Sequence, residues 1–179
     1  LRVLIVNTAR KKNISEAVIE KDYWVTFILD YLFNENKWKE YLTFKGGTSL
    51  SKCFGLIERF SEDIDLILDW RVLGYEEKEP WIERSNTKQD KFNKAVNEKT
   101  ELFLRDEFLK VLEEDLKDFD FEFSIDTIDP QTILCKYPKI FESNYLTQNI
   151  RLEIGSLAAW TPAIGVKISP IISETYPCL

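Results

Sequence analysis

The segment that most restricts the fold reads DIDLIL, residues 63–68, an apolar run of strand length that contains two aspartates. Residues i and i+2 of a strand point to the same face, so Asp63 and Asp65 lie side by side and the apolar residues point to the opposite face. We therefore predict a strand with one face in the core and one face that carries two carboxylates. Like charges this close repel unless a cation lies between them, which favours a cation-binding site. A bare D-x-D pattern also occurs at the solvent-exposed end of an ordinary strand, and that alternative stays open.

Two glycines precede this strand, at the corner between an expected strand, YLTF, and an expected helix that begins in GGTSLSKCFGLI. Glycine tolerates positive φ and lets a backbone approach a ligand closely. The free N–H groups of a helix N-terminus attract phosphate, and Gly46, Gly47 and Thr48 would open such a helix. The simpler interpretation is a tight strand-to-helix turn with a hydroxyl cap.

A third acid lies in a later strand pattern, NIRLEIGSLAAW at 149–160. Its apolar residues point one way, whereas Arg151 and Glu153 point the other. If this strand neighbours residues 63–68, Glu153 joins the two aspartates. Carboxylates are the hard oxygen ligands that Mg²⁺ prefers, and two such ions can share them. The strand order itself does not follow from the sequence.

Helical patterns occupy three other segments. Asn13 and Glu16 form a capping-box pattern, which predicts a helix from there to about residue 35. In GGTSLSKCFGLI the apolar residues, among them Leu50 and Phe54, are expected to face the core. A third helix is predicted over 88–117 from its apolar spacing.

Strictly alternating residues predict a strand at 118–126, and TILCKY at 132–137 is its expected antiparallel partner after an Asp-Pro-Gln turn. Together with the strands above, these elements predict an α+β fold. Its sheet is mixed and mostly antiparallel, with helices packed on one face.

The amino-acid composition limits the kinds of catalysis and metal binding that this chain can support. The chain of 179 residues contains no histidine, and its three cysteines show no C-x-x-C spacing. Histidine-based catalysis and the usual zinc sites are therefore excluded, and acid–base or metal chemistry falls to carboxylates, lysine or bound water. The formal net charge of −7 argues mildly against a generally basic surface for nucleic acid.

No apolar stretch approaches the roughly 20 residues that a membrane-spanning helix needs, and the N-terminus lacks the order of a signal peptide. We expect a cytoplasmic protein with no membrane partner. The chain begins with Leu1 and contains no methionine, so we also expect a fragment of a longer protein.

Together, these residues resemble the nucleotidyltransferase (polymerase β-like) superfamily, in which a glycine pair and a small hydroxyl residue open a helix before a D-x-D strand and a later acidic strand. More narrowly, FKGGTSLSK…ERFSEDIDL is similar to the AbiEii/AbiGii toxin family of type IV toxin–antitoxin and abortive-infection systems. EKDYWVTFIL and YPKIF…IRLEIGSLAAW resemble further segments of that family. The resemblance implies a nucleotidyltransferase fold, with a helical segment at 1–40 and a catalytic core at 41–179. It also implies that the core is truncated, because family members continue into a further helical region.

The resemblance also implies roles for single residues. Two aspartates and a glutamate would be catalytic and hold the metal, the glycine corner would hold nucleotide phosphates, and two more residues are weaker candidates for phosphate contacts. The carboxylates are Asp63, Asp65 and Glu153, the corner is Gly46, Gly47 and Thr48, and the weaker candidates are Ser61 and Lys52.

The implied activity is transfer of a nucleotide from an NTP to an acceptor hydroxyl, with one or two Mg²⁺ ions. RNA, in particular tRNA, is the expected acceptor, and a cognate antitoxin is the expected partner. Two alternatives stay open. A glycosyltransferase also uses D-x-D to hold a metal with a nucleotide sugar, although it normally needs a longer nucleotide-binding half. The other is an inactive, partner-binding domain of the same fold.

Overall fold

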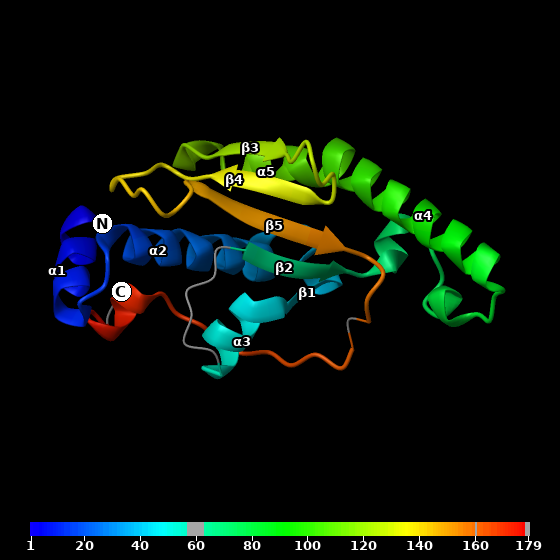
Figure 1. The fold of residues 1–179 in the computed structure, drawn as a ribbon, viewed down its shortest axis with the longest axis horizontal. Coiled ribbons are helices and arrows are strands. Elements are labelled where there is room, and N and C mark those ends of the chain that lie inside the picture. Colours follow the sequence, from blue (N-terminus) through cyan, green and yellow to red (C-terminus); the bar gives the residue numbers. More distant parts are fainter. Residues whose placement is uncertain (57–62, 160, 178–179) are drawn as a thin grey trace.

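The computed structural model describes residues 1–56, 63–159 and 161–177. Its five-stranded sheet has the order β1-β2-β5-β4-β3, which Figure 1 shows from bottom to top. The strands are β1 (Leu42–Lys45), β2 (Asp63–Leu68), β3 (Glu122–Ile125), β4 (Thr132–Lys136) and β5 (Asn149–Gly155).

Most of the strand pairing is antiparallel, and only β2 with β5 runs parallel within the described sheet. β3 and β4 form the predicted hairpin. β3 is shorter than predicted, because Lys117–Phe119 forms a 3-10 turn and Asp120 adopts a left-handed conformation with φ 54°. The α+β class with a mixed, mostly antiparallel sheet is confirmed.

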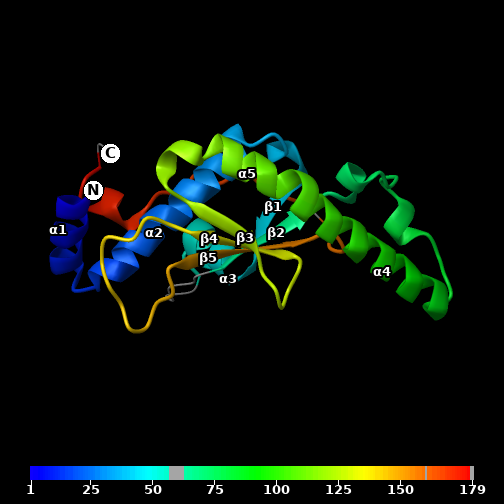
Figure 2. The same cartoon turned by 90° about the horizontal axis from the view of Figure 1, so that it is seen from above.

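The helices are α1 (Arg2–Lys12), α2 (Glu16–Asp30), α3 (Gly46–Phe54), α4 (Asn86–Phe103) and α5 (Leu109–Asp115). A π-turn extends α2, and another joins α4 to α5, so the helix predicted over 88–117 is one nearly continuous run. α4 projects beyond the end of the sheet (Figure 2). In the part of the chain that the structure describes, no helix combines the length and the apolar character that crossing a membrane requires.

The main core lies between the sheet and the helical layer formed by α2, α4 and α5. Alternate residues of β2 and β5, such as Ile64, Leu66 and Leu152, are fully buried in it, as period-two patterning predicts. Trp24 and Ile28 of α2 belong to the same core. α2 therefore packs with the sheet, and the division of the chain at residue 40 stays a prediction.

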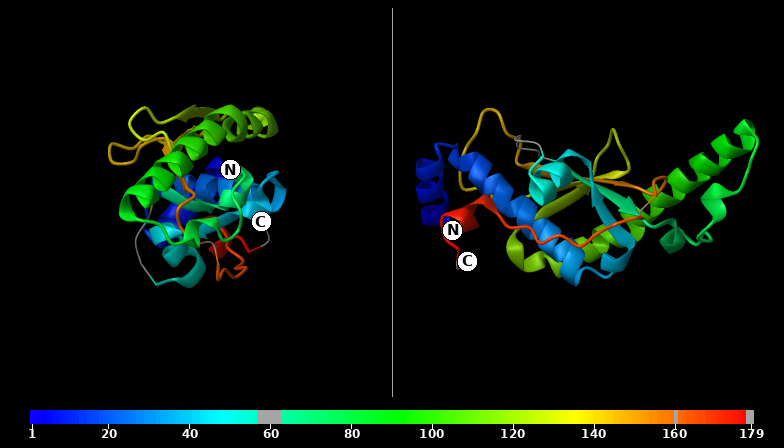
Figure 3. Two further views of the ribbon diagram at one scale, coloured as in Figure 1. Left: turned by 90° about the vertical axis from the view of Figure 1, so that its right-hand side faces the viewer. Right: turned by 90° about the horizontal axis from the view of Figure 1, so that it is seen from below.

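A second, smaller core joins the two ends of the chain. Ile5 and Ala9 of α1 pack against Ile19 of α2 and Ile172, which lies in a 3-10 turn at Ile171–Glu174. Figure 3 shows the segment that follows β5 running back past α3 to reach α1. α1 and the 3-10 turn at Ile171–Glu174 therefore lie at the same end of the molecule.

Three consecutive charged residues of α2, Glu20, Lys21 and Asp22, are buried. Each binds a segment that is distant in sequence. Glu20 accepts hydrogen bonds from the N–H groups of residues 140 and 141, and Lys21 donates to the carbonyl oxygen of Thr147. Burial raises the pKa of Glu20 even though those N–H groups oppose the shift. The three side chains fix α2 to the rest of the fold by hydrogen bonds to buried charges, which are stronger than neutral ones.

Asp22 has partners in two separate segments. One of its oxygens accepts a hydrogen bond from the Lys52 ammonium of α3, and the other accepts one from the N–H of Ile171 at 2.6 Å. Only 12% of the Lys52 side chain and 6% of the Asp22 side chain are exposed. A single carboxylate therefore connects α2, α3 and the C-terminal segment.

Two local predictions are wrong. Asn13 does not cap α2; it ends α1 in the left-handed conformation that often terminates helices, and α2 begins at Glu16 after Ser15. The apolar side chains of α3 do not face the core either, since Leu50 and Phe54 are 40% and 48% exposed. α3 instead buries the polar residues of its first turn, Thr48 and Ser49.

Replacing Asp22 with alanine should lower the free energy of unfolding by about 3–5 kcal/mol, because it leaves the ammonium of Lys52 buried without its carboxylate. The additional change Lys52→Met should recover part of that loss. Urea unfolding followed by tryptophan fluorescence measures both. Asp118→Ala, at an exposed site, should stay within about 0.5 kcal/mol. An Asp22→Ala loss no larger than that of the control would contradict this role.

Candidate active site

The polar face of β2 and β5 carries the three predicted carboxylates. β2 and β5 run parallel, with Asp65 paired to Glu153 and Asp63 paired to Arg151. Parallel-paired residues point to the same face of a sheet, and the neighbouring residues of both strands are buried on the opposite, helix-covered face. The two strands are therefore neighbours, which was the condition for Glu153 to join the aspartates, and the three acids lie on the face that α2, α4 and α5 leave uncovered.

Two cationic side chains lie among these acids. The Nε atom of Arg151 is 3.8 Å from Asp63 and 3.3 Å from Glu153, and the Nζ atom of Lys45 is 3.8 Å from Asp65. Each acid of the predicted site thus has a cation nearby, at a distance longer than a tight ion pair. This is one way for the fold to tolerate three like charges on two adjacent strands.

The fit of a divalent cation follows from the donor chemistry of this face. Within residues 1–56, 63–159 and 161–177, no three acidic or cysteine side chains lie close enough together to hold a metal ion. The donors themselves fit Mg²⁺, since all three are carboxylates on strands roughly 4.8 Å apart. Their side chains are partly exposed, so their oxygens are accessible from solvent on this face.

Gly46 forms a corner directly against one of these acids. It begins α3 with φ +75°, and a Cβ atom built on it would lie 1.8 Å from Oδ2 of Asp65. Both the backbone conformation and the lack of space therefore require glycine here. The predicted glycine corner does face the predicted acids, and Gly47 follows it in the first turn of α3.

The hydroxyl of Thr48 donates to the backbone carbonyl oxygen of Asp63. Thr48 is also buried, so in this structure it fastens α3 to β2 and does not point towards a ligand. The remaining two candidates do not extend the site. Lys52 is held by Asp22 and Thr26 of α2, and Ser61 lies outside the described residues. Phosphate binding by any of these residues stays a prediction.

Sequence reasoning missed the side chain that links these acids to a second part of the sheet. Nη1 of Arg151 donates to Oδ2 of Asp126 at 2.7 Å, just after β3. The N–H of Ile128 and the Arg151 guanidinium lower the pKa of Asp126. The position of Arg151 two residues before Glu153 was a usable signal. Nothing in the sequence pattern predicted Asp126, whose role depends on the strand order.

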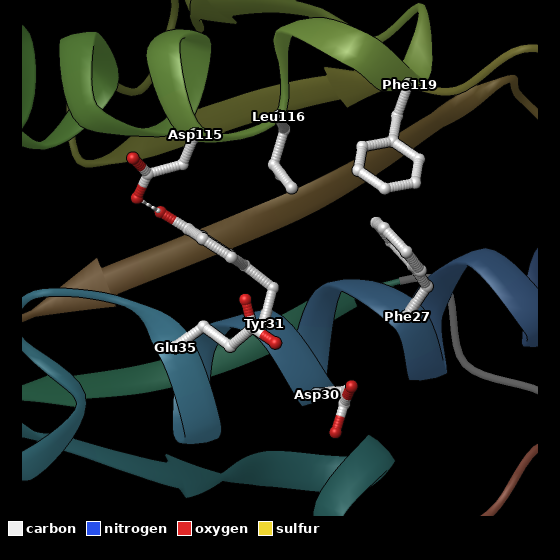
Figure 4. Close-up of a pocket in the computed structure, with 7 residues that line it drawn as sticks. All are labelled: Phe27, Asp30, Tyr31, Glu35, Asp115, Leu116 and Phe119. Carbon is white, nitrogen blue, oxygen red and sulfur yellow. Dashed lines mark hydrogen bonds between the residues drawn. The ribbon is translucent and has the colours of Figure 1, made fainter.

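A separate cavity of about 370 Å³ lies between α2 and the end of α5 (Figure 4). Asp30, Glu35 and Asp115 line it together with aromatic side chains, and the Tyr31 hydroxyl donates to Asp115 at 2.7 Å. Burial and Asp115 raise the pKa of Tyr31. No basic side chain is among the described residues that line this cavity. Its negative charge makes it unsuitable for a triphosphate, and the carboxylates of β2 and β5 remain the candidate site.

Comparisons with known proteins give one structural neighbour and one family. No curated protein matches the chain. A solved structure that resembles it is MenT4, a nucleotidyltransferase toxin from Mycobacterium tuberculosis, with 20% sequence identity and a TM-score of 0.38. The match covers 87% of this chain and 43% of that one, so this chain spans less than half the length of that protein.

The family comparison is more extensive. A family model described as "Nucleotidyl transferase AbiEii toxin, Type IV TA system" matches residues 28–179. That range includes the glycine corner, both strands that carry the acids, and Asp126. The chain therefore belongs to the AbiEii family of nucleotidyltransferase toxins from type IV toxin–antitoxin systems.

Proposed function

We propose that this chain carries the reaction centre of a nucleotidyltransferase toxin, which moves a nucleotide from an NTP to an acceptor hydroxyl. The observation that supports the proposal most is the register of β2 and β5, which sets Asp65 beside Glu153 with Asp63 on the same face. The contact between Gly46 and Asp65 adds a corner at which phosphate can approach. Membership of the AbiEii family agrees with both.

In this proposal Asp63, Asp65 and Glu153 hold Mg²⁺, as one ion or two. The ion would supply charge neutralisation for the triphosphate and would lower the pKa of an attacking hydroxyl. The protein's own part is to position the reactants. β2 and β5 fix the carboxylates at one level of the sheet, and this limits where a nucleotide can be placed.

The N-terminus of α3 is the proposed seat for the nucleotide phosphates. Gly46 and Gly47 present backbone N–H groups there and have no side chains of their own to obstruct a phosphate, and no side chain caps α3 in the described part of the chain. Thr48 supports the corner indirectly, because its hydrogen bond to Asp63 fixes the distance between the α3 N-terminus and β2. The positive end of the helix dipole favours phosphate at this position.

We propose RNA as the acceptor, and tRNA first, because the resemblance seen in the sequence implies it and because a terminal ribose offers free hydroxyl groups. A cognate antitoxin is the proposed protein partner, as for a type IV toxin–antitoxin family. The cytoplasm, where NTPs and tRNA are found, is the proposed location. The acceptor, the antitoxin and the location are proposals about the whole protein.

The direct test incubates the full-length protein with Mg²⁺, each α-labelled NTP and bulk tRNA, and follows the label into RNA. Parallel reactions contain a labelled nucleotide sugar. Label from an NTP in RNA supports the proposal, whereas label from the nucleotide sugar would identify a glycosyltransferase. The absence of transfer, together with no heat of binding for Mg²⁺ and NTP in calorimetry, would favour an inactive partner-binding domain.

Asp65→Asn should reduce transfer by at least about 100-fold, because it removes a charged metal ligand. The melting temperature without metal should stay within about 2 °C of the wild type, since the variant removes repulsion between acids as well as a weak surface pair with Lys45. Asp90→Asn, at an exposed position of α4, is the matched control and should keep full activity. Unfolding of Asp65→Asn would instead indicate a structural role.

Gly46→Ala and Gly55→Ala form a matched pair at the two ends of α3. Both positions have positive φ, +75° and +60°, but a Cβ on Gly55 meets nothing within 4 Å, whereas one on Gly46 collides with Asp65. Each variant should lose about 1 kcal/mol of stability from backbone strain, and Gly46→Ala should lose more because Asp65 must move away from the new Cβ atom. Only Gly46→Ala should also lose transfer, by roughly 100-fold, measured as kcat/KM. Equal activity in the two variants would rule out the proposed role of the corner.

A further inference from the structure

Arg151 occupies an unusual position in the candidate site. It is paired with Asp63 across the parallel strands and lies two residues before Glu153 on the same strand face. A guanidinium at this position competes with any other cation for the same carboxylate oxygens. The contacts of Arg151 show how that competition is limited.

The Arg151 guanidinium is held firmly at one end and loosely at the other. Nη1 donates to Asp126 at 2.7 Å, whereas Nε is 3.3 Å from Glu153 and 3.8 Å from Asp63. The exposed fractions follow the same order: 12% of the Asp126 side chain is exposed, against 38% for Glu153 and 43% for Asp63. The contact with Asp126 is therefore the strong one, and the contacts with the site acids are the ones that another cation can replace.

Asp126 is itself fixed by the turn between β3 and β4. Its Oδ1 atom accepts the N–H of Ile128 at 2.8 Å, and its own N–H donates to the carbonyl oxygen of Thr132 at 2.9 Å. A carboxylate held in this way offers a fixed anchor for the guanidinium. The anchor pulls Arg151 towards the β3–β4 turn and away from the oxygens of Asp63 and Glu153.

We propose that Arg151 is a tethered counter-ion of the site: it screens Asp63 and Glu153 when no metal is bound, and Asp126 keeps it from blocking the metal. Arg151 and Asp126 are thus positioning residues that set the affinity for a divalent cation. This inference rests on the proposed metal-dependent function and adds to it the two residues that set how tightly the metal binds. Among the described residues, the connected cluster around Arg151 and Lys45 has four carboxylates and two cations, so its charge is negative and favours a divalent ion.

The test measures the affinity for Mn²⁺ and Mg²⁺ by calorimetry on the full-length protein, independently of any activity. Arg151→Gln should bind the metal at least about fivefold more tightly, because the competing cation is gone. Asp126→Asn should bind it about three- to fivefold more weakly, because the freed guanidinium moves onto Asp63 and Glu153. Arg105→Gln removes an equal charge from an exposed pair with Asp106 on the π-turn before α5 and should change nothing.

A double variant separates anchoring from simple charge. If Asp126 acts by holding Arg151, then Asp126→Asn should have less than a twofold effect in the Arg151→Gln background. An equal loss of affinity in both backgrounds would overturn the anchoring role. Arg151→Lys keeps the positive charge but lacks the planar guanidinium group and its several donors. Its affinity for the metal should fall between those of the wild type and Arg151→Gln.

Melting curves in EDTA supply a second readout and a check on folding. Arg151→Gln should melt at a lower temperature than the wild type without metal, and adding Asp63→Asn should restore part of the loss by removing one repelling acid. An Arg151→Gln affinity within twofold of the wild type, while Asp65→Asn abolishes binding, would overturn this inference and leave the proposed function standing. A wild-type protein that binds neither ion would overturn both.

Discussion

The candidate site depends on the parallel pairing of β2 with β5. The two strands are far apart in the sequence, and their register places Asp65 beside Glu153 and Asp63 beside Arg151. Because side chains alternate along a strand, a shift by one residue would turn the acids of one strand into the core. The fully buried residues Ile64, Leu66 and Leu152 prevent that shift. The packing of the apolar face therefore fixes the register, and the register determines which charged side chains lie together on the other face.

The charged face differs from the rest of the surface in how its charges are balanced. Isolated surface ion pairs contribute little to stability, but here Arg151 contacts three carboxylates and holds them near one another. Lys45 adds a second cation at the edge next to the glycine corner. The acids are thus stabilised by weak contacts that leave their oxygens partly exposed. Such an arrangement suits a site that exchanges its cation, and it suits a purely structural ion pair less well.

Much of the fold could be predicted from the sequence, because a strand with one buried face alternates apolar and polar residues. The alternation in residues 63–68 and 149–155 predicted two strands with acids on one face, and the hairpin of β3 and β4 followed from the same signal. α3 shows where this reasoning fails. Its apolar residues have helical spacing, yet Leu50 and Phe54 point to solvent, because the helix packs by its first turn, where Gly46 contacts Asp65 and Thr48 bonds to Asp63.

The candidate site was predictable only in part for a related reason. The three acids and the glycines could be found because each interrupts an apolar pattern. Arg151 and Asp126 belong to the same site, but an arginine on a polar strand face and an aspartate after a strand are ordinary features of any sequence. Their contact depends on the strand order, in which β4 alone separates β3 from β5. A strand order of this kind depends on tertiary packing and not on local pattern.

The buried charges of α2 have a consequence for how the molecule is made. Glu20 and Lys21 find their partners around residues 140–147, and Asp22 needs Lys52 and the backbone of Ile171. During synthesis α2 leaves the ribosome before these partners do. Until then the helix would have to bury unpaired charges in order to dock, which costs several kcal/mol. We therefore expect α2 to dock stably only after its partners, up to the segment around residue 171, have been synthesised.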